Sequence, residues 1–188
     1  DQRADGTREL LPKPGVDTGM GLERLCAVKQ GVYANYETDL FAPIMEHTRQ
    51  ALGDTPAQMA EKQTGYRVVA DHGRAMTFLI ADGILPGNEG RGYVLRLIMR
   101  RAMRFGKGLG FSGPFLGGVA DAVIALMGHH YTELVERRDF ILRVIAQEEE
   151  RFQRTLDAGS ALLEGTIARL KAEGTNVIPG ADVFRLYD

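Results

Sequence analysis

The sequence predicts a mainly α-helical protein, a bundle-like array of helices with a short strand-and-loop segment at its N-terminal end. From residue 39 onward, apolar residues recur at helical spacing through most of the chain. Glycines stand where several of these periodic segments end, as is usual at helix C-termini. Near residues 15–21 the pattern changes to a short run that leads through glycines into a helix.

Composition and charge narrow the class of protein. The 188 residues are 44% hydrophobic and 26% charged, which is typical of a globular chain with one sizeable core or two small ones. The net charge is −2, so a polyanion could bind only at a local basic patch. The single cysteine, Cys26, excludes an internal disulfide and suits a reducing cytosol. We expect a cytoplasmic protein without membrane contact, because no apolar run approaches the ~20 residues that span a bilayer. The sequence does not indicate the oligomeric state.

The first helix is predicted over residues 22–29, after a short strand that passes through Gly19 and Gly21. Glycines let the backbone approach a ligand closely, and the N–H groups at a helix start favour anions. Arg24, near the start of this helix, could offer its guanidinium to a phosphate. A tight strand-to-helix junction that binds nothing explains the same residues.

Six further helical segments are predicted. They cover residues 39–52, 66–81, 94–107, 115–127, 131–171 and 181–188. The longest has apolar residues every eleven positions, close to the period of a straight helix, and we expect it to run continuously or to bend near Gly159 or Gly165. The run of charges at 148–151 within it is interpreted as a solvated face. His129 and His130 lack partners at metal-ligand spacing, so no metal site is expected.

The helix over 94–107 has a basic stripe. A helical wheel places Val94, Ile98, Ala102 and Phe105 on one side and Arg96, Arg100, Arg104 and Lys107 on the other. Like charges one turn apart repel by roughly 0.2–0.5 kcal/mol per pair, so something else must favour the stripe. A polyanion could do so, as could carboxylates on a neighbouring helix, and the spacing alone favours the carboxylates.

Four stretches of the chain resemble the alanyl-tRNA synthetase family. Residues 11–24 (LPKPGVDTGMGLER) are similar to the third class II signature. Residues 71–74 with 81–83, residues 88–96 (NEGRGYVLR) and residues 184–188 (FRLYD) are similar to the helical tRNA-recognition region that follows. Because these motifs occur in order along essentially the whole chain, we identify it as a member of this family. We assign residues 1–36 to the C-terminal edge of the class II catalytic domain and residues 37–188 to the acceptor-stem recognition domain.

The resemblance implies a reaction. The family forms alanyl-adenylate from alanine and ATP with Mg²⁺, and then transfers alanine to its tRNA. By position, Asp17 would hold the amino group of alanine, and Gly19 and Gly21 would leave room only for a small side chain. Arg24 would pair with ATP phosphate and stabilise the charge that develops as pyrophosphate leaves. ATP and Mg²⁺ are thus expected in the parent enzyme, with no metal site in this chain.

The resemblance also implies recognition of a G·U wobble pair in the acceptor stem of tRNA(Ala). Asn88 would reach the pair from one groove side and Asp188 from the other, where an Asn or Asp can accept from the guanine amino group. Arg96, Arg100 and Arg104 would contact phosphates, which position the RNA without specifying its sequence. A helix N-cap role explains Asn88 equally well, and Asp188 could be a frayed chain end.

Other functions fit the same residues. One is a non-catalytic helical RNA-binding module that shares ancestry with this region, and another is a helical interaction protein whose basic stripe meets an acidic partner. The first two class II signatures are expected upstream of Asp1 and the editing domain downstream of Asp188, so we expect a fragment that does not activate alanine alone. Gly90 departs from the family pattern, in which many relatives have a second polar residue there.

Overall fold

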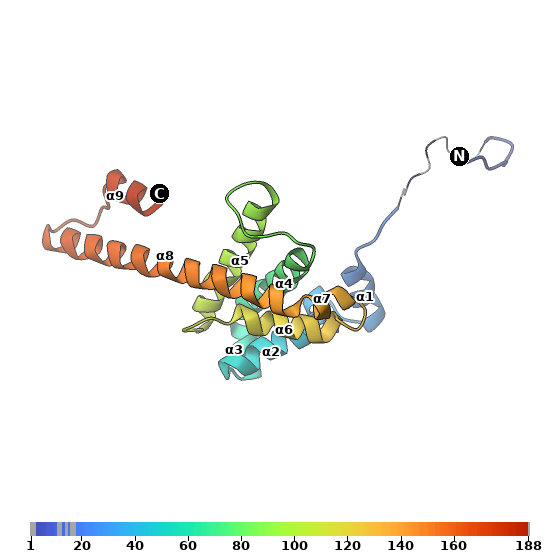
Figure 1. Ribbon diagram of the computed structural model, residues 1–188, viewed down its shortest axis with the longest axis horizontal. Helices are drawn as coiled ribbons and strands as arrows, with labels where there is room; N and C mark the ends of the chain where they lie inside the picture. The colour runs from blue at the N-terminus through green and yellow to red at the C-terminus, as the bar shows by residue number, and fades with distance from the viewer. Residues whose placement is uncertain (1–2, 11–12, 14, 16–17, 188) are drawn as a thin grey trace. The chain divides into compact units, whose positions relative to one another are not determined.

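A computed structural model of the chain describes residues 3–10, 13, 15 and 18–187 (Figure 1). The chain divides into two compact units, Asp1–Leu40 and Phe41–Asp188. The predicted mainly helical fold is confirmed. The described residues form no β-strand, so the expected N-terminal strand is not seen, and residues 16 and 17 of that stretch lie outside them. The functional division at residue 36 stays a prediction.

The N-terminal unit contains helix α1 (Leu22–Gln30) and the 3₁₀ turn η1 (Asn35–Glu37). Helix α1 begins at the predicted residue and ends at Gly31, whose φ of 68° is left-handed. Such a conformation is common one residue past a helix and favours glycine. The Gln30 side chain donates to Asp39 Oδ1 (2.7 Å) and accepts from the Asp39 N–H (3.1 Å), which links the end of α1 to the segment after η1.

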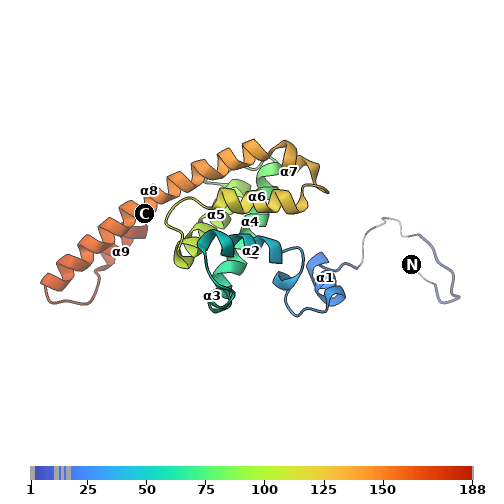
Figure 2. The same cartoon turned by 90° about the horizontal axis from the view of Figure 1, so that it is seen from below.

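The larger unit is an assembly of helices around α4. Its helices are α2 (Ala42–Leu52), α3 (Pro56–Glu61), α4 (Gln63–Ala81), α5 (Gly90–Leu109), α6 (Leu116–Met127), α7 (Thr132–Glu136), α8 (Arg138–Ala172) and α9 (Gly180–Tyr187). Helix α4 packs against α2, α5, α6 and α7 (Figure 2). The core between them consists of buried apolar side chains, among them Met76, Ile80, Leu95, Met99, Leu116, Ala120, Leu134, Ile141 and Ile145.

The predicted helix over 131–171 is interrupted. Helix α7 ends before Arg137, and α8 then runs from Arg138 without a break through Gly159 and Gly165. The break is a single residue, Arg137, whose guanidinium donates a 2.5 Å hydrogen bond to the carbonyl of Ala81 at the end of α4. Basic side chains commonly donate to the last carbonyls of a helix in this way, so Arg137 ties the start of α8 to the end of α4.

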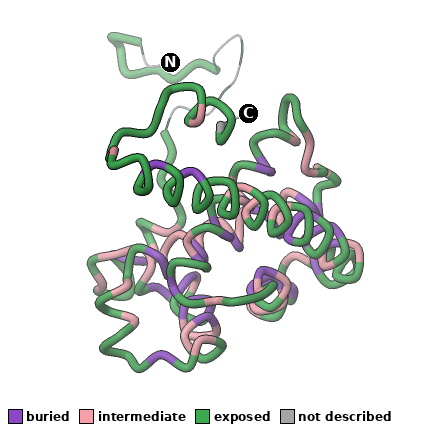
Figure 3. Tube along the Cα trace, turned by 90° about the vertical axis from the view of Figure 1, so that its left-hand side faces the viewer, coloured by how far each residue is buried: buried purple, intermediate pink, exposed green. Residues whose placement is uncertain are grey.

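The two halves of α8 have different surroundings. Its first half packs on the core through Ile141 and Ile145, whereas most of its middle is exposed (Figure 3). Near its end, α9 folds back beside it (Figure 1), and Arg169 forms a 2.6 Å ion pair with Asp182. The helix thus extends from the packed core to a small distal contact with α9.

The predicted buried face of α5 is wrong in part. The helical wheel puts Val94 on the apolar side, yet 53% of it is exposed, while Leu95, Met99 and Ala102 are buried. The wheel places Arg96 on the side opposite Val94 and Ala102. Arg96 instead turns inward, so the buried face is rotated toward it.

Candidate functional site

The turn between α4 and α5 presents Asn88. The N–H of Gly87 donates to the carbonyl of Gly92 (3.0 Å), which folds the turn back onto the first turn of α5. A Cβ on Gly92 would lie 2.6 Å from the carbonyl oxygen of Leu85, so only glycine fits this approach. Asn88 is exposed at the end of the turn. The N-cap of α5 is Glu89, without a side-chain capping bond, so the N-cap explanation of Asn88 is wrong.

Arg96 holds the side chain of Asn88. Its Nη1 donates to Asn88 Oδ1, and its Nη2 donates to the carbonyl of Pro86 at 3.3 Å. A guanidinium has donors and no acceptor, so the amide atom that faces it must be the oxygen. The Arg96 side chain is only 11% exposed. The buried guanidinium of Arg96 therefore holds the turn through a side-chain and a backbone hydrogen bond.

A buried carboxylate on α8 balances this charge. Glu148 is 3% exposed, and its Oε1 lies 3.1 Å from Nε of Arg96 and 3.1 Å from Nε of Arg100. The contact with Arg100 is a hydrogen bond, whereas Arg96 Nε meets the carboxylate as an ion pair without hydrogen-bond geometry. A buried carboxylate is costly unless it is paired, so Glu148 needs these arginines. Carboxylates on a neighbouring helix, one of the two explanations of the stripe, thus account for Arg96 and Arg100.

The rest of the basic surface on α5 faces solvent. Arg91, Arg101, Arg104 and Lys107 are exposed. Arg101 lies over the ring of Phe105 at 5.5 Å, and Arg104 borders a cavity of about 380 Å³ that Lys62 also lines. Exposed guanidinium groups can reach a phosphate without first breaking a buried pair. Among the three predicted phosphate contacts, Arg104 meets this condition best.

Glu148 and Glu149 were predicted to lie on a solvated face, and this is wrong. Both are buried, and Glu149 Oε1 accepts 3.0 Å hydrogen bonds from the N–H groups of Phe115 and Leu116 at the start of α6. Burial raises the pKa of the Glu149 carboxyl, and the hydrogen bonds from these N–H groups offset part of that rise. The two residues follow Ile141 and Ile145 at helical spacing, so they lie on the same face of the helix as these buried residues. This spacing could have predicted their burial from the sequence.

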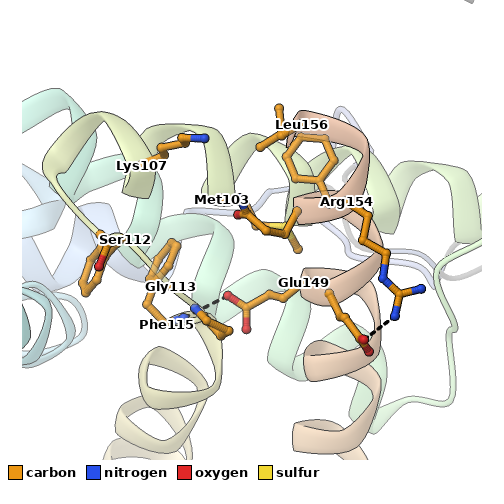
Figure 4. Close-up of a pocket in the computed structure, with 13 residues that line it drawn as sticks. Met103, Lys107, Ser112, Gly113, Phe115, Glu149, Arg154 and Leu156 are labelled. Atoms are coloured by element: carbon orange, nitrogen blue, oxygen red, sulfur yellow. Dashed lines mark hydrogen bonds and ion pairs between the residues drawn. The ribbon is translucent and has the colours of Figure 1, made fainter. Parts of the chain in front are cut away.

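Beside Glu149 lies a second cavity, of about 260 Å³ (Figure 4). Met103 from α5 and Phe115 line it, and Lys107 and Arg154 stand at its edge (Figure 4). The rings of Phe111 and Phe115 stack at 4.2 Å between centroids. This cavity contains none of the residues predicted to bind ATP, alanine or tRNA.

The remaining predicted residues belong to the chain ends. Gly19 and Arg24 are exposed in the N-terminal unit, and Gly21 is the N-cap of α1. Asp17 and Asp188 lie outside the described residues. The structure thus brings Asn88, Arg96 and Arg100 together within the larger unit. In the described part of the chain, no three His, Cys, Asp or Glu side chains come together as metal ligands, and none of the helices there could cross a membrane.

Comparison with known proteins shows the family. Residues 1–188 match the family described as tRNA synthetases class II (A). The chain belongs to this family. Curated alanine–tRNA ligases are similar to this class II chain: those of Nitratidesulfovibrio vulgaris (52% identical over 188 residues), Geobacillus kaustophilus (50% over 184) and Lawsonia intracellularis (50% over 188). The matches cover 98–100% of this chain and 21% of each relative, so the chain spans about a fifth of their length.

Proposed function

We propose that this chain is the part of an alanine–tRNA ligase that contributes third-signature contacts to ATP and alanine and recognises the acceptor stem of tRNA(Ala). The main support is the match at 52% identity to an alanine–tRNA ligase over all 188 residues. The parent enzyme would activate alanine with ATP and Mg²⁺ and transfer it to the tRNA. We assign residues 1–36 to its catalytic domain and residues 37–188 to stem recognition.

On the catalytic side, Asp17 would hold the amino group of alanine, and Gly19 with Gly21 would limit the side chain that fits. Arg24 would pair with ATP phosphate. Its exposure near the start of α1 supports this role, because anions are favoured at helix N-termini. The described residues do not fit a metal site, so we assign no step to Mg²⁺ within this chain.

On the RNA side, Asn88 and Asp188 would recognise the G·U pair. The exposed position of Asn88, in a turn that the Gly87–Gly92 hydrogen bond folds back onto α5, supports this assignment. Arg104 would contact phosphate, as would Arg100 through the exposed 31% of its side chain. Arg96 would have to leave Glu148 before it could contact phosphate, so the structure supports a phosphate contact less for Arg96 than for Arg104.

Binding to acceptor-stem duplexes tests this proposal. Two RNAs that differ only in G·U against G·C are titrated with the full chain, residues 1–188, at several salt concentrations. We expect tighter binding to the G·U duplex, a strong salt dependence from phosphate contacts, and loss of the G·U preference in Asn88→Ala. Equal binding of both duplexes would favour the non-catalytic helical RNA-binding module.

A second measurement addresses catalysis. Because most of the ATP site is expected in other parts of the parent enzyme, we expect no ATP–pyrophosphate exchange by residues 1–188. Exchange by the purified chain would show that this division of the catalytic site is wrong.

A further inference from the structure

We propose that Arg151 of α8 contacts a phosphate of the acceptor stem beside the G·U pair. This role rests on the proposed function, in which Asn88 recognises that pair. In the sequence, Arg151 ends the run of charges at 148–151, and its type and spacing gave no reason to connect it with RNA. The tertiary structure supplies the reason through its position, its charge surroundings and its exposure.

Arg151 lies beside the turn that bears Asn88, although the two are far apart in the chain. Asn88 follows Pro86 by two residues, and the Arg96 guanidinium donates to Asn88 Oδ1 and to the Pro86 carbonyl. A cavity of about 150 Å³ separates this turn from α8, and residues of both line it: Leu85, Pro86, Val144, Gln147, Glu148 and Arg151. For a duplex whose G·U pair lies against Asn88, the phosphates that flank the pair are those within reach of Arg151.

The charges around Glu148 do not balance. Its Oε1 lies 3.1 Å from Nε of Arg96 and 3.1 Å from Nε of Arg100, and its Oε2 lies 3.9 Å from Nη1 of Arg151. One carboxylate therefore faces three guanidinium groups, and a guanidinium does not lose its proton in proteins. The cluster keeps a net positive charge, which an anion would stabilise.

Neighbouring carboxylates do not supply that anion. Glu149 accepts hydrogen bonds from N–H groups of α6, and Glu150 pairs with Arg154. Glu89, which is exposed in the turn, forms no ion pair with Arg151. Within the described part of the chain, Glu148 is the single ion-pair partner of Arg151. The surplus charge thus remains on Arg151.

Arg151 is also the arginine of this cluster that is most accessible to RNA. Its side chain is 65% exposed, against 31% for Arg100 and 11% for Arg96. Its 3.9 Å contact with Glu148 is too long for a hydrogen bond, so turning to a phosphate breaks none there. Glu148 would still keep its two closer arginines. A guanidinium can then bind phosphate oxygens through two parallel hydrogen bonds.

Salt titrations of the full chain, residues 1–188, with the G·U and G·C duplexes test the phosphate contact. Arg151→Ala should reduce the slope of log K against log salt by about 0.7–0.9 for both duplexes. The loss of affinity should therefore be about threefold larger at the lower end of a fourfold range of salt than at the upper end. The G·U preference should persist, and Arg151→Lys, which keeps the charge, should keep the slope.

Arg138→Ala is the matched control on the same helix. Arg138 pairs with Asp121 of α6 at 2.8 Å on both sides of its fork, and its removal should leave the slope unchanged. Structural damage is checked by urea denaturation. Because Arg151 is exposed on a helix and alanine is a strong helix former, Arg151→Ala should leave the midpoint unchanged.

A second arm locates the phosphate. One phosphate at a time in the G·U duplex is replaced by an uncharged methylphosphonate, either beside the G·U pair or at the far end of the stem. For the unmodified chain, one of the replacements beside the pair should weaken binding. Arg151→Ala should be insensitive to that replacement, because a contact already lost is not lost again. Replacement at the far end should affect both proteins equally.

The outcomes are distinct. If residues 1–188 bind neither duplex, the proposed function fails, and the role of Arg151 fails with it. If the chain binds with a G·U preference and Arg151→Ala keeps the full slope, only the role of Arg151 is overturned. A changed G·U preference in Arg151→Ala overturns the assignment to phosphate. A reduced slope with undiminished sensitivity to every replacement beside the pair overturns the position of the contact on the stem.

Discussion

Arg100 and Glu148 join α5 to α8 through a 3.1 Å hydrogen bond, although 48 residues separate them in the chain. The bond neutralises part of the basic stripe within the fold. Arg100 also lies over the Phe152 ring at 5.1 Å, which restrains it further. The charge that the stripe presents to solvent is therefore smaller than the wheel suggests, and it lies on Arg104 and Lys107.

The first prediction concerns Arg104. Arg104→Ala should weaken binding of G·U and G·C duplexes alike and reduce the slope of log K against log salt by about 0.7–0.9, the change for one phosphate contact. The G·U preference should persist, since a phosphate contact carries no sequence information. Salt titrations of both duplexes measure this. Arg138→Ala, which removes an arginine from an α6–α8 ion pair, serves as the control and should leave the slope unchanged.

The second prediction concerns Glu149 and pH. Burial holds the pKa of the Glu149 carboxyl above its ordinary value of 4.5. The folded state therefore keeps this proton to higher pH than the unfolded state does. The contribution of the Glu149 carboxyl to the free energy of unfolding is fully present below its unfolded pKa. It is lost as pH rises through the folded pKa.

Glu149→Gln keeps an oxygen for the N–H groups of α6 and cannot titrate. Relative to wild type, its free energy of unfolding should increase as pH rises from below 4.5 to neutral. Urea denaturation at a series of pH values measures the difference. The adjacent Glu150, exposed and paired with Arg154, supplies the control Glu150→Gln. A difference between wild type and Glu149→Gln that does not vary with pH would contradict the prediction.

The third prediction concerns Tyr66, which is fully buried and donates a 2.7 Å hydrogen bond to Asp54 Oδ2. This bond is the largest cause of the lowered pKa of the Asp54 carboxyl, and the contact with Lys62 Nζ at 3.0 Å is the next. Tyr66→Phe should raise the Asp54 pKa toward its ordinary value of 3.8, which an NMR titration can follow.

The same variant should also be less stable. Because the pKa of Asp54 is lowered in the folded state, the Asp54 carboxylate stabilises the fold at pH values above its unfolded pKa. This contribution is lost as pH falls through the folded pKa. Tyr66→Phe should therefore lower the midpoint of urea denaturation most at neutral pH. An unchanged Asp54 pKa in the variant would mean that the cations Lys62 and Arg49 set it without the tyrosine hydroxyl.

The fourth prediction concerns Gly106 on α5. A Cβ there would lie 2.1 Å from Cζ of Phe115, so the ring would have to move out of its stack with Phe111. Gly106→Ala should destabilise the protein by about 1–3 kcal/mol through overpacking. Chemical denaturation measures this.

Gly108 in the same helix provides the matched control, because no atom lies within 4 Å of the position that a Cβ would take there. Gly108→Ala should be neutral or stabilising by up to about 1 kcal/mol. Phe115→Leu should relieve part of the Gly106→Ala penalty, so the two changes should combine less than additively. If the double variant loses the sum of the two single-variant stability losses, the clash of the new Cβ is not with Phe115.

Much of the helical pattern could be predicted because helix ends are local. The starts and stops at Leu22, Gly53 and Gly128 agree with the structure, since glycine past a helix end is written directly in the sequence. The interruption at Arg137 could not be predicted in this way. No glycine or proline marks it, and the partner of the Arg137 side chain, the carbonyl of Ala81, lies 56 residues away.

The candidate site divides in the same manner. By itself, the sequence determined the family, the mainly helical class and the motif residues, among them Arg24 and Asn88, because these depend on residue type and spacing. Only the tertiary structure decided that Arg96 and Glu148 point inward while Arg104 points outward. A charged side chain can be buried only where another helix supplies the opposite charge, and α8 supplies it to α5 through Glu148.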